Sequence, residues 1–543
     1  MRTRIPALLA AGALAALAPA LARAQDVETL SRTGGRALPP AYFERVRQEP
    51  DFFELQRGWS RRETAARQGA SGPELVVLPV RGNLRMLVVM TLFSDSPEPP
   101  FATSVIEQQL FGANPQGNLN QYYREVSGNR VNLTGTVLPW MRTGVPLSQA
   151  VGTSMGLGAD ADMGGYLVDA VRRLDATVDY GQYDNDGPDG VANSGDDDGY
   201  VDVTVFQFSE VAASCGGPGV WPHRSSIRGW TREPYRSNDR RPNGQPVLVD
   251  DYIIQSAVDC DGQPQTIATI AHETGHAFGL PDFYDHTGGI LPQQRRWVLG
   301  CWTLMAAGSW GCGDGSTFGK VTAPSHMGAY EKLELGWAAT TITQPGWRRE
   351  YVLDPVQTSG QLLQVPLRFA EEFLLLEYRP KTGFDVALPA GGVLVYHVQP
   401  GLPLRPCATC DRVYRVGLVE ADGDGALRRT ALEGGNRGVA GDIFGGTRVL
   451  GDNTMPALRL NDGGRTNVRL EMTVVGGQAR IRVSTLPIVL RDPLLSPLLL
   501  SGAAAPSADE LLALDAFGNG NGRYDVGDLS AYVKSRPGAL AGG

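Results

Sequence analysis

The chain has 543 residues, too many for one ordinary domain, and its 42% hydrophobic and 20% charged residues exclude a largely disordered protein. Its 58 acidic residues outnumber its 49 lysines and arginines, so the net charge is −9. That balance argues against a nucleic-acid-binding protein, because such proteins draw their affinity from a basic surface.

The first 24 residues have the pattern of a secretory signal peptide. Arg2 and Arg4 form a basic start, residues 6–19 are apolar, and the sequence ending at Ala24 is a small-x-small cleavage site. The apolar stretch is short and interrupted by two prolines, which argues against a membrane anchor, and no later segment is long and apolar enough to span a membrane. We therefore predict a secreted, extracellular protein with no membrane span.

Residues 25–78 are polar, rich in arginine and poorly periodic, with a short helix expected around 41–57. The character changes at residues 84–93, a continuous apolar run that predicts a buried central strand. Two helical patterns and an alternating strand pattern follow, at 103–110, 161–175 and 201–208. This mixture predicts an α+β domain with a mixed sheet over residues 79–345.

Within that domain, residues 179–202 hold eight aspartates, and no lysine or arginine occurs between Arg173 and Arg224. Aspartates at alternate positions with glycines between them suit the oxygen-rich coordination of Ca²⁺, although a solvated acidic loop is the alternative. The candidate calcium ligands are Asp184, Asp186, Asp189, Asp196, Asp198 and Asp202. No full EF-hand loop is present, so the number of ions stays open.

The chain has six cysteines, and an even number in an exported protein predicts disulfides. Sequence proximity favours two pairs and leaves a third, namely Cys301–Cys312, Cys407–Cys410 and Cys215–Cys260. Metal binding by the CxxC at 407–410 is the alternative. It is the weaker one, because neither a second CxxC nor a nearby histidine pair accompanies it.

The most informative segment is HETGH, which begins at His272 and ends at His276. Only six histidines occur in the chain, and two that are four residues apart on a helix lie on one face and can bind one Zn²⁺. Glu273 lies beside the first of them, where it can take a proton from zinc-bound water, whose pKa zinc lowers to roughly 7. Gly279 permits the left-handed turn that would end the helix.

The spacing favours Asp282 as the third zinc ligand, because it occupies the last position of HExxHxxGxxD. A glutamate on the following helix, as in thermolysin-like enzymes, is disfavoured, since no glutamate follows Glu273 until Glu331. Asp285 and His286 are the alternatives. A fourth position would stay open for water or a substrate carbonyl, as catalytic zinc requires.

Short strand patterns separated by turn residues follow residue 345 and predict a β-sandwich-like domain over 346–487. A linker at 488–508 then leads to a tail at 509–543 that resembles half of a dockerin-type, EF-hand-like repeat. Four of its residues fall on calcium-loop positions, Asn519, Asn521, Asp525 and Asp528. Phe517 replaces the first aspartate and no second repeat follows, which argues against calcium binding and against a cohesin-type partner there.

Together, HETGHAFGLPD and the downstream CWTLMAAGSW resemble the metzincin pairing of a zinc helix with a Met-turn. The chain is more specifically similar to the immune inhibitor A type of bacterial metalloprotease, the M6 peptidase family, from about residue 50 to residue 450. The stretches FFELQRGW, YYREVSGNRVNLTGTV and EEFLLLEYRPKTGFDVALPAGGVLVYHV support the resemblance, as do YDNDGPDG and DDDGYVDV.

The resemblance implies a zinc site in which His272, His276 and Asp282 bind the metal, Glu273 is the general base and Met305 forms an apolar floor. It also implies that residues 25–78 are a propeptide that keeps the enzyme latent. No cysteine occurs in that region, so latency through a cysteine switch is excluded. The donor that stabilises the oxyanion is not assigned, and three residues are candidates, Tyr284, His326 and Tyr330.

The sequence thus predicts a multi-domain α+β protein, with a metzincin-like zinc protease domain that is followed by a β-sandwich-like domain. The predicted function is that of a secreted zinc endopeptidase, a zymogen that acts on protein or peptide substrates and that binds structural Ca²⁺. A non-catalytic, calcium-stabilised surface or adhesion protein with a vestigial zinc site is the alternative.

Overall fold

The computed structural model describes residues 37–57, 59, 80–114, 117–187, 189–287, 292–313, 324–367, 371–404, 412–485, 508–518 and 523–534. The predicted signal peptide, much of the predicted propeptide, nearly all of the predicted linker and the Cys407–Cys410 pair lie outside these residues. Within them, no helix has the length and apolar character needed to cross a membrane.

The first module is built around a sheet of six strands in the order β2-β1-β4-β8-β5, with β3 paired to β1. The strands are β1 (Gly82–Leu92), β2 (Val131–Val137), β3 (Met141–Arg142), β4 (Thr204–Phe208), β5 (His223–Ser226) and β8 (Asp251–Ser256). Every pair is parallel except β5 with β8. The predictions of strands at 84–93 and 201–208 are confirmed, and β5 is left as an antiparallel edge.

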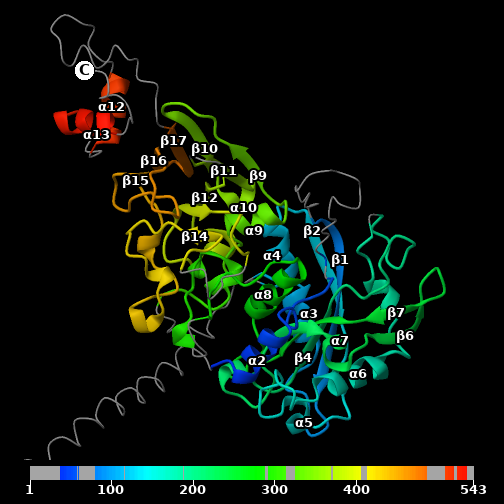
Figure 1. Cartoon of the computed structure of the whole chain (residues 1–543). Helices are drawn as coiled ribbons and strands as arrows, with labels where there is room; N and C mark the ends of the chain where they lie inside the picture. The colour runs from blue at the N-terminus through cyan, green and yellow to red at the C-terminus, as the bar shows by residue number, and fades with distance from the viewer. Residues whose placement is uncertain are drawn as a thin grey trace, which may run out of the picture.

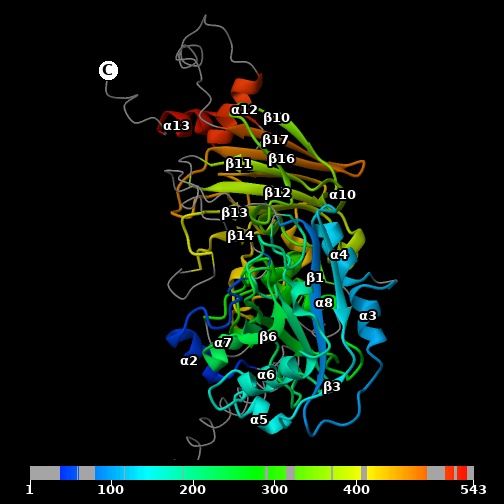
Figure 2. The ribbon, with the colours of Figure 1, turned by 90° about the vertical axis from the view of Figure 1, so that its right-hand side faces the viewer.

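Helices cover both faces of this sheet, as the alternation of side chains along β1 shows. Met86, Val88 and Met90 point to one core cluster, whereas Leu87 and Val89 point to another. One face of the sheet is covered by α3 (Ser104–Leu110), α4 (Leu119–Val126) and α8 (Ile267–Ala277). The other face is covered by α5 (Leu147–Val151) and α6 (Met163–Leu174), as Figure 1 and Figure 2 show. The predicted helices at 103–110 and 161–175 are α3 and α6.

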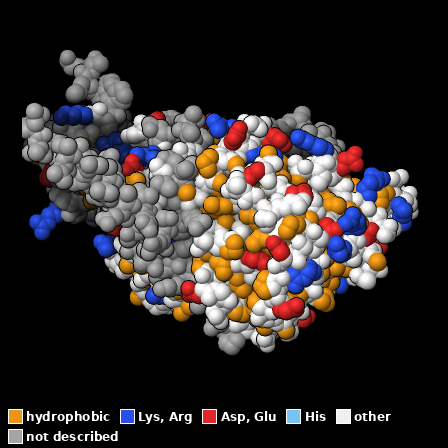
Figure 3. Space-filling view, turned by 90° about the horizontal axis from the view of Figure 1, so that it is seen from below, with side chains coloured by type: hydrophobic (Ala, Val, Ile, Leu, Met, Phe, Trp, Pro, Cys, Tyr) orange, Lys and Arg blue, Asp and Glu red, His pale blue; other side chains and the backbone are white. Residues whose placement is uncertain are grey.

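Three smaller elements decorate this module, namely α7 (Ile227–Thr231) and the hairpin of β6 (Tyr235–Arg240) and β7 (Pro246–Val249). Both disulfides whose cysteines lie in the described residues are formed as predicted, Cys215–Cys260 and Cys301–Cys312. The lower face of the molecule, seen in Figure 3, mixes acidic, basic and apolar side chains.

The second module has two further sheets, of which the larger has the order β14-β13-β12-β11-β9 and the smaller β10-β17-β16-β15. The larger sheet consists of β9 (Ala339–Ile342), β11 (Gln361–Pro366), β12 (Phe373–Arg379), β13 (Gly392–Val398) and β14 (Val416–Leu418). The smaller consists of β10 (Arg349–Leu353), β15 (Thr447–Gly451), β16 (Val468–Val475) and β17 (Gln478–Thr485). One core cluster takes alternate side chains from both sheets, so the two pack face to face.

A buried network of charges joins the two modules. Lys332, on α9 (Ala329–Glu334), places its Nζ 2.6 Å from Oε2 of Glu377 on β12. Arg379 contacts Glu377 at 3.1 Å and Asp385 at 2.5 Å, and it donates to the Trp302 carbonyl at 2.8 Å. All these charged side chains are essentially inaccessible to solvent. The Lys332–Glu377 pair therefore crosses the module boundary, and each buried charge depends on a partner within this network.

Residues near the two ends of the described chain pack on these modules. The helix expected around 41–57 is shorter, α2 (Pro40–Gln48), and the chain then turns so that Trp59 is buried against Phe278 of the first module. At the other end, α12 (Ala508–Phe517) and α13 (Val526–Lys534) enclose a small core against Trp347 of the second module, whereas α10 (Val356–Ser359) packs on β12 and α4. Figure 1 shows this tail at one extremity.

Candidate active site

Helix α8 carries the HETGH segment and is held by its ends and by its apolar face. The Thr266 hydroxyl caps its first turn by accepting from the Ala268 amide, and Gly279 ends it with a φ of 84°. Ile267 and Ile270 are buried in the main core. The helix is therefore fixed before any metal binds, and His272 and His276 lie one turn apart on one face.

Backbone carbonyls orient both imidazoles in the same way. His272 Nδ1 lies 3.0 Å from the Leu304 carbonyl, and His276 Nδ1 lies 2.7 Å from the Leu280 carbonyl. When Nδ1 donates these bonds, a neutral ring has its lone pair on Nε2, the nitrogen that faces Asp282 in both histidines. This is the arrangement by which outer hydrogen bonds prepare histidines as metal ligands.

Asp282 meets both of these nitrogens just beyond the Gly279 turn. Its Oδ1 lies 3.0 Å from Nε2 of His272 and 3.5 Å from Nε2 of His276. Burial raises the pKa of this carboxyl, but the two histidines and Arg224 outweigh burial and hold that pKa well below its usual range. Two imidazole nitrogens and one carboxylate oxygen thus converge on one point, which is the donor set of a catalytic zinc site.

The alternatives for the third ligand lie elsewhere. Asp285 accepts from the Tyr414 hydroxyl at 2.8 Å and pairs with Arg296 at 3.1 Å, so its carboxylate is committed to a different cluster. The His286 ring packs near Tyr42 and Phe43 of the N-terminal segment. Neither residue approaches the two histidines in the way that Asp282 does.

Met305 lies directly beneath α8. A Cβ placed on Gly275, between the two histidines, would overlap its sulfur and come within 3.1 Å of its Cε. The turn that carries it, Leu304–Gly308, is held by Glu331, which accepts from the Met305 amide at 3.1 Å and from the Thr303 hydroxyl. The methionine thus forms an apolar surface under the histidines.

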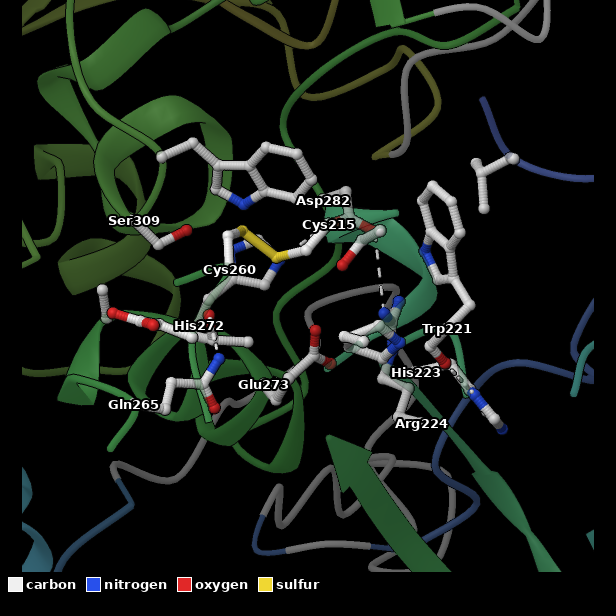
Figure 4. A pocket seen from close by; sticks show the side chains of 18 of the residues that line it. Cys215, Trp221, His223, Arg224, Cys260, Gln265, His272, Glu273, Asp282 and Ser309 are labelled. Atoms are coloured by element: carbon white, nitrogen blue, oxygen red, sulfur yellow. Dashed lines mark hydrogen bonds and ion pairs between the residues drawn. A yellow bond between two sulfur atoms is a disulfide. The ribbon is translucent and has the colours of Figure 1, made fainter. Parts of the chain in front are cut away.

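Glu273 faces the cavity beside these groups, as Figure 4 shows. Burial raises the pKa of its carboxyl above the ordinary value, against the attraction of His272 and Arg224. Its Oε2 and the Nε2 of His276 are buried without a hydrogen-bond partner. Buried polar atoms seldom lack partners unless an ion or water is bound, so these atoms fit a metal and its water.

Comparison with known proteins agrees with this geometry. Residues 106–338 match the family model described as immune inhibitor A peptidase M6, catalytic domain. This part of the chain, which we call the M6 domain, is therefore similar to the catalytic domain of that family. The match includes α8, the turn of Met305 and α9, and it confirms the resemblance that the sequence motifs indicated.

Two curated relatives match part of the chain. Pre-pro-metalloprotease PrtV of Vibrio cholerae serotype O1 is 30% identical over 207 residues, which are 36% of this chain and 21% of the relative. Immune inhibitor A of Bacillus thuringiensis subsp. alesti is 27% identical over 268 residues, 43% of this chain and 36% of the relative. The chain thus spans about a fifth to a third of the length of the relatives that it matches.

The M6 domain has a further charged residue at the site that the sequence analysis missed. Arg224, on the edge strand β5, places Nη1 3.6 Å from Oδ2 of Asp282 and Nη2 3.0 Å from Oε1 of Glu54. Figure 4 shows it across the cavity from His272. The one signal in the sequence is that Arg224 ends a stretch of fifty residues without lysine or arginine.

One of the three candidates for the oxyanion donor lines the cavity of the M6 domain. Tyr284 is part of the wall, together with Trp310 and Arg295. His326 is instead buried against Lys332, with its Nδ1 3.3 Å from Nζ. Tyr330 is buried beside Phe283 and is not part of this wall.

The N-terminal segment forms the opposite wall. Leu38, Tyr42 and Phe53 line the same cavity, and Glu54 reaches Arg224. The Phe52 carbonyl also accepts from the Ser225 hydroxyl of β5 at 2.6 Å. Residues that the sequence assigns to a propeptide therefore lie along the edge strand of the M6 domain, next to the histidine pair.

Three of the eight aspartates at 179–202 form a cluster in the M6 domain. Asp184, Asp186 and Asp202 each offer an oxygen within 4.8 Å of the others. The remaining candidate ligands lie outside this group and bind local partners. Asp198 pairs with Arg57 at 2.9 Å, Asp196 accepts from the Asp189 amide, and Asp189 accepts from the Val191 amide. Three of the six predicted ligands thus converge, whereas Asp189 and Asp196 bind partners within the loop and Asp198 pairs with Arg57.

Proposed function

We propose that the chain is a secreted zinc-dependent endopeptidase that hydrolyses peptide bonds of protein substrates. The observation that carries the proposal is the convergence of His272, His276 and Asp282 beside Glu273 in an M6 domain. Both histidines direct Nε2 toward Asp282, and Glu273 has a buried, unpartnered oxygen. This donor set suits Zn²⁺ better than Ca²⁺ or Mg²⁺, which prefer oxygen ligands.

Bound zinc would supply Lewis-acid polarisation of the substrate carbonyl and lower the pKa of water. The side chains around the metal would transfer the proton and position the ligands. Glu273 would accept a proton from the attacking water and deliver it to the departing amine, a role for which its raised pKa is suited. Arg224 holds Asp282 in place through its guanidinium, and Met305 keeps the floor of the site apolar. Tyr284 is the candidate from this wall for a hydrogen bond to the developing oxyanion.

The test is hydrolysis of casein by the mature protein and by a Glu273→Gln variant. The variant keeps the shape of the side chain and loses the base, so we expect activity to fall at least about a hundredfold with zinc content unchanged. Glu107→Gln, an exposed substitution on α3, is the matched control and should retain activity. Wild-type activity in Glu273→Gln would contradict the proposed base.

The third ligand is tested by metal content. Asp282→Ala should lose zinc at a concentration of chelator that leaves the wild type loaded, because two histidines alone bind zinc weakly. Full zinc content in this variant would transfer the assignment to Asp285 or His286. A chain that binds zinc in all variants and cleaves no protein would instead favour the alternative, a calcium-stabilised surface or adhesion protein with a vestigial zinc site.

We further propose that residues 1–24 are a signal peptide and that 25–78 are a propeptide that blocks the site. Tyr42 and Phe53 on the cavity wall, with the Glu54–Arg224 ion pair, support the latter. Cleavage after this segment should raise activity towards casein. Glu54→Gln should also raise the basal activity of the uncleaved chain, because it removes the charge that attracts Arg224; equal activity before and after cleavage would refute latency.

The remaining domain assignments are proposed on the same basis. A metzincin-like protease domain over 79–345 is supported by the zinc helix with Met305 beneath it. A β-sandwich-like domain over 346–487 is supported by the single core between two sheets. A linker at 488–508 and a tail at 509–543 complete the division.

Calcium is proposed at Asp184, Asp186 and Asp202. Asp184 is almost completely buried, and its Oδ2 has no hydrogen-bond partner. Burial, followed by the neighbouring aspartates, raises the pKa of Asp184 to about 7. A divalent cation would relieve this repulsion, so calcium should raise the melting temperature of the wild type and should have less effect on Asp184→Asn.

A further inference from the structure

A second group of carboxylates lies in the second module, away from the zinc helix. Glu420 follows β14, Asp422 lies in the next turn, and Asp442 ends the short helix Ala440–Asp442. Their ligand oxygens all lie within 4.8 Å of one another. A backbone hydrogen bond joins the two segments that carry these carboxylates, since the Ala421 amide donates to the Asp442 carbonyl at 2.9 Å.

One oxygen in this group is buried and has no hydrogen-bond partner. The Oδ2 of Asp442 accepts from the Trp302 indole at 2.8 Å and from the Val439 amide at 3.0 Å. Its Oδ1 accepts nothing, although the whole residue is only 1% exposed. A carboxylate oxygen that is removed from water and left unpaired is costly unless a cation binds it.

The charges around the group do not balance it. Glu420, Asp422 and Asp442 form no ion pair with a basic side chain in the part of the chain that the structure describes. A fourth carboxylate, Asp424, lies close by and pairs with Arg429 at 3.8 Å, and the buried Arg428 attracts Glu420, so four carboxylates face two guanidinium groups. Burial and then the adjacent carboxylates raise the pKa of Glu420 to about 8, and burial raises that of Asp442 to about 6. Excess negative charge is therefore concentrated here.

We propose that Glu420, Asp422 and Asp442 form a Ca²⁺ site that holds the second module to the Met-turn of the first. All three donors are hard carboxylate oxygens, and no histidine or cysteine belongs to the group, which favours Ca²⁺ over Zn²⁺. Two ligands are nearly inaccessible and the third is exposed, so the ion can enter from solvent on the side of Asp422.

The position of the site explains what the ion would do. Asp442 binds the indole of Trp302, which is followed directly by the turn that carries Met305. The Cys301 amide, one residue earlier, donates to the Arg437 carbonyl at 2.6 Å. An ion that fixes Asp442 therefore also fixes the segment 437–442 against the base of the candidate active site.

The direct test is to count calcium ions on the full chain. The protein is treated with a chelator, dialysed against defined CaCl₂, and analysed for bound metal. Asp422→Asn is the informative variant, because Asp422 is exposed and the substitution should not disturb folding. We expect it to bind one Ca²⁺ fewer than the wild type, or to bind that ion about tenfold more weakly. Asp462→Asn, an exposed aspartate of the same module, is the control and should bind as the wild type does.

The site must also be distinguished from the cluster at 184–202. Asp184→Asn and Asp422→Asn should each lose a different ion, so that their losses add in the double variant. Terbium gives a second readout, because Tb³⁺ replaces Ca²⁺ and is excited through a neighbouring tryptophan. Trp302→Phe should remove the same part of the luminescence that Asp422→Asn removes, while leaving the number of bound calcium ions unchanged.

Two results would overturn the proposal. One is an Asp422→Asn protein that binds as many calcium ions as the wild type with the same affinity. The other is an Asp184→Asn protein that binds none, since the second cluster would then be empty at the calcium concentrations that fill the first. Both measurements follow ion binding alone and hold whether or not the chain cleaves proteins.

Discussion

At the scale of the residue, His223 is buried on β5 between the Trp221 carbonyl and the Tyr252 hydroxyl, with Arg224 beside it. Burial, aided by Arg224, lowers the pKa of His223 to about 4. Between pH 6.5 and pH 4, the unfolded chain therefore binds a proton at His223 and the folded chain does not. The stability associated with neutral His223 is complete above pH 6.5 and is lost as the pH falls toward 4.

Between pH 7 and pH 5 this loss should amount to about 2 kcal/mol of unfolding free energy. His223→Gln removes the titration, so the stability of the variant should fall less over that range, by about the same amount. Urea unfolding at the two pH values measures the difference, in which the titration of the other histidines cancels. Parallel losses in the two proteins would contradict the assignment.

What the sequence could predict at this scale depended on local spacing. His272 and His276 were found because one helical turn brings residues i and i+4 together, so a pattern within five letters is enough. Arg224 was missed because no such pattern exists for it. Its place beside Asp282 follows from the antiparallel pairing of β5 with β8, which is a contact between distant segments.

At the scale of the element, α8 and the turn Leu304–Gly308 fit without spare room at Gly275. Alanine usually stabilises a helix by up to about 1 kcal/mol relative to glycine. Here its methyl group would overlap the sulfur of Met305, which is fully buried and cannot withdraw freely. We expect Gly275→Ala to destabilise the protein by about 2 kcal/mol, as overpacked cores do.

A double-mutant cycle checks the cause. Met305→Ala alone leaves a cavity and should also destabilise the protein, but it removes the atom that the new methyl group would strike. Gly275→Ala with Met305→Ala should therefore be more stable than the sum of the single effects, by more than about 0.5 kcal/mol. Strict additivity would show that the two residues do not touch.

Elements were predictable where burial is continuous. The run that forms β1 is buried from Leu84 onward apart from one position, so its apolar letters identified it. Most strands that no pattern indicated are short or lie at edges, as with β14, which has three residues, and β9, whose four residues are largely exposed. The exception is β8, a buried strand inside the sheet, whose sequence DYIIQS mixes polar and apolar residues. Such strands form because a neighbour offers hydrogen bonds, and their own composition does not reveal them.

At the scale of the whole molecule, the sequence indicated two modules but not what joins them. The joint is the buried group formed by Lys332, Glu377, Arg379 and Asp385, whose members lie up to 53 positions apart along the chain, from Lys332 to Asp385. Charged residues are mostly exposed in proteins, so the amino-acid composition of these segments does not predict a buried charged core. Only the packing of α9 on β12 brings the four together.

This joint should make the two modules unfold as one unit. Lys332→Met leaves Glu377 with Arg379 as its only cationic partner in the group, in a place without water, and breaking a buried pair in this way commonly destabilises a protein by about 3–5 kcal/mol. We expect the single calorimetric transition of the wild type to separate into two.

Lys332→Met with Glu377→Gln removes both charges and should recover part of the lost stability. Glu350→Gln breaks an exposed pair within the second module and should leave the thermogram unchanged; two transitions already present in the wild type would show that the joint does not couple the modules.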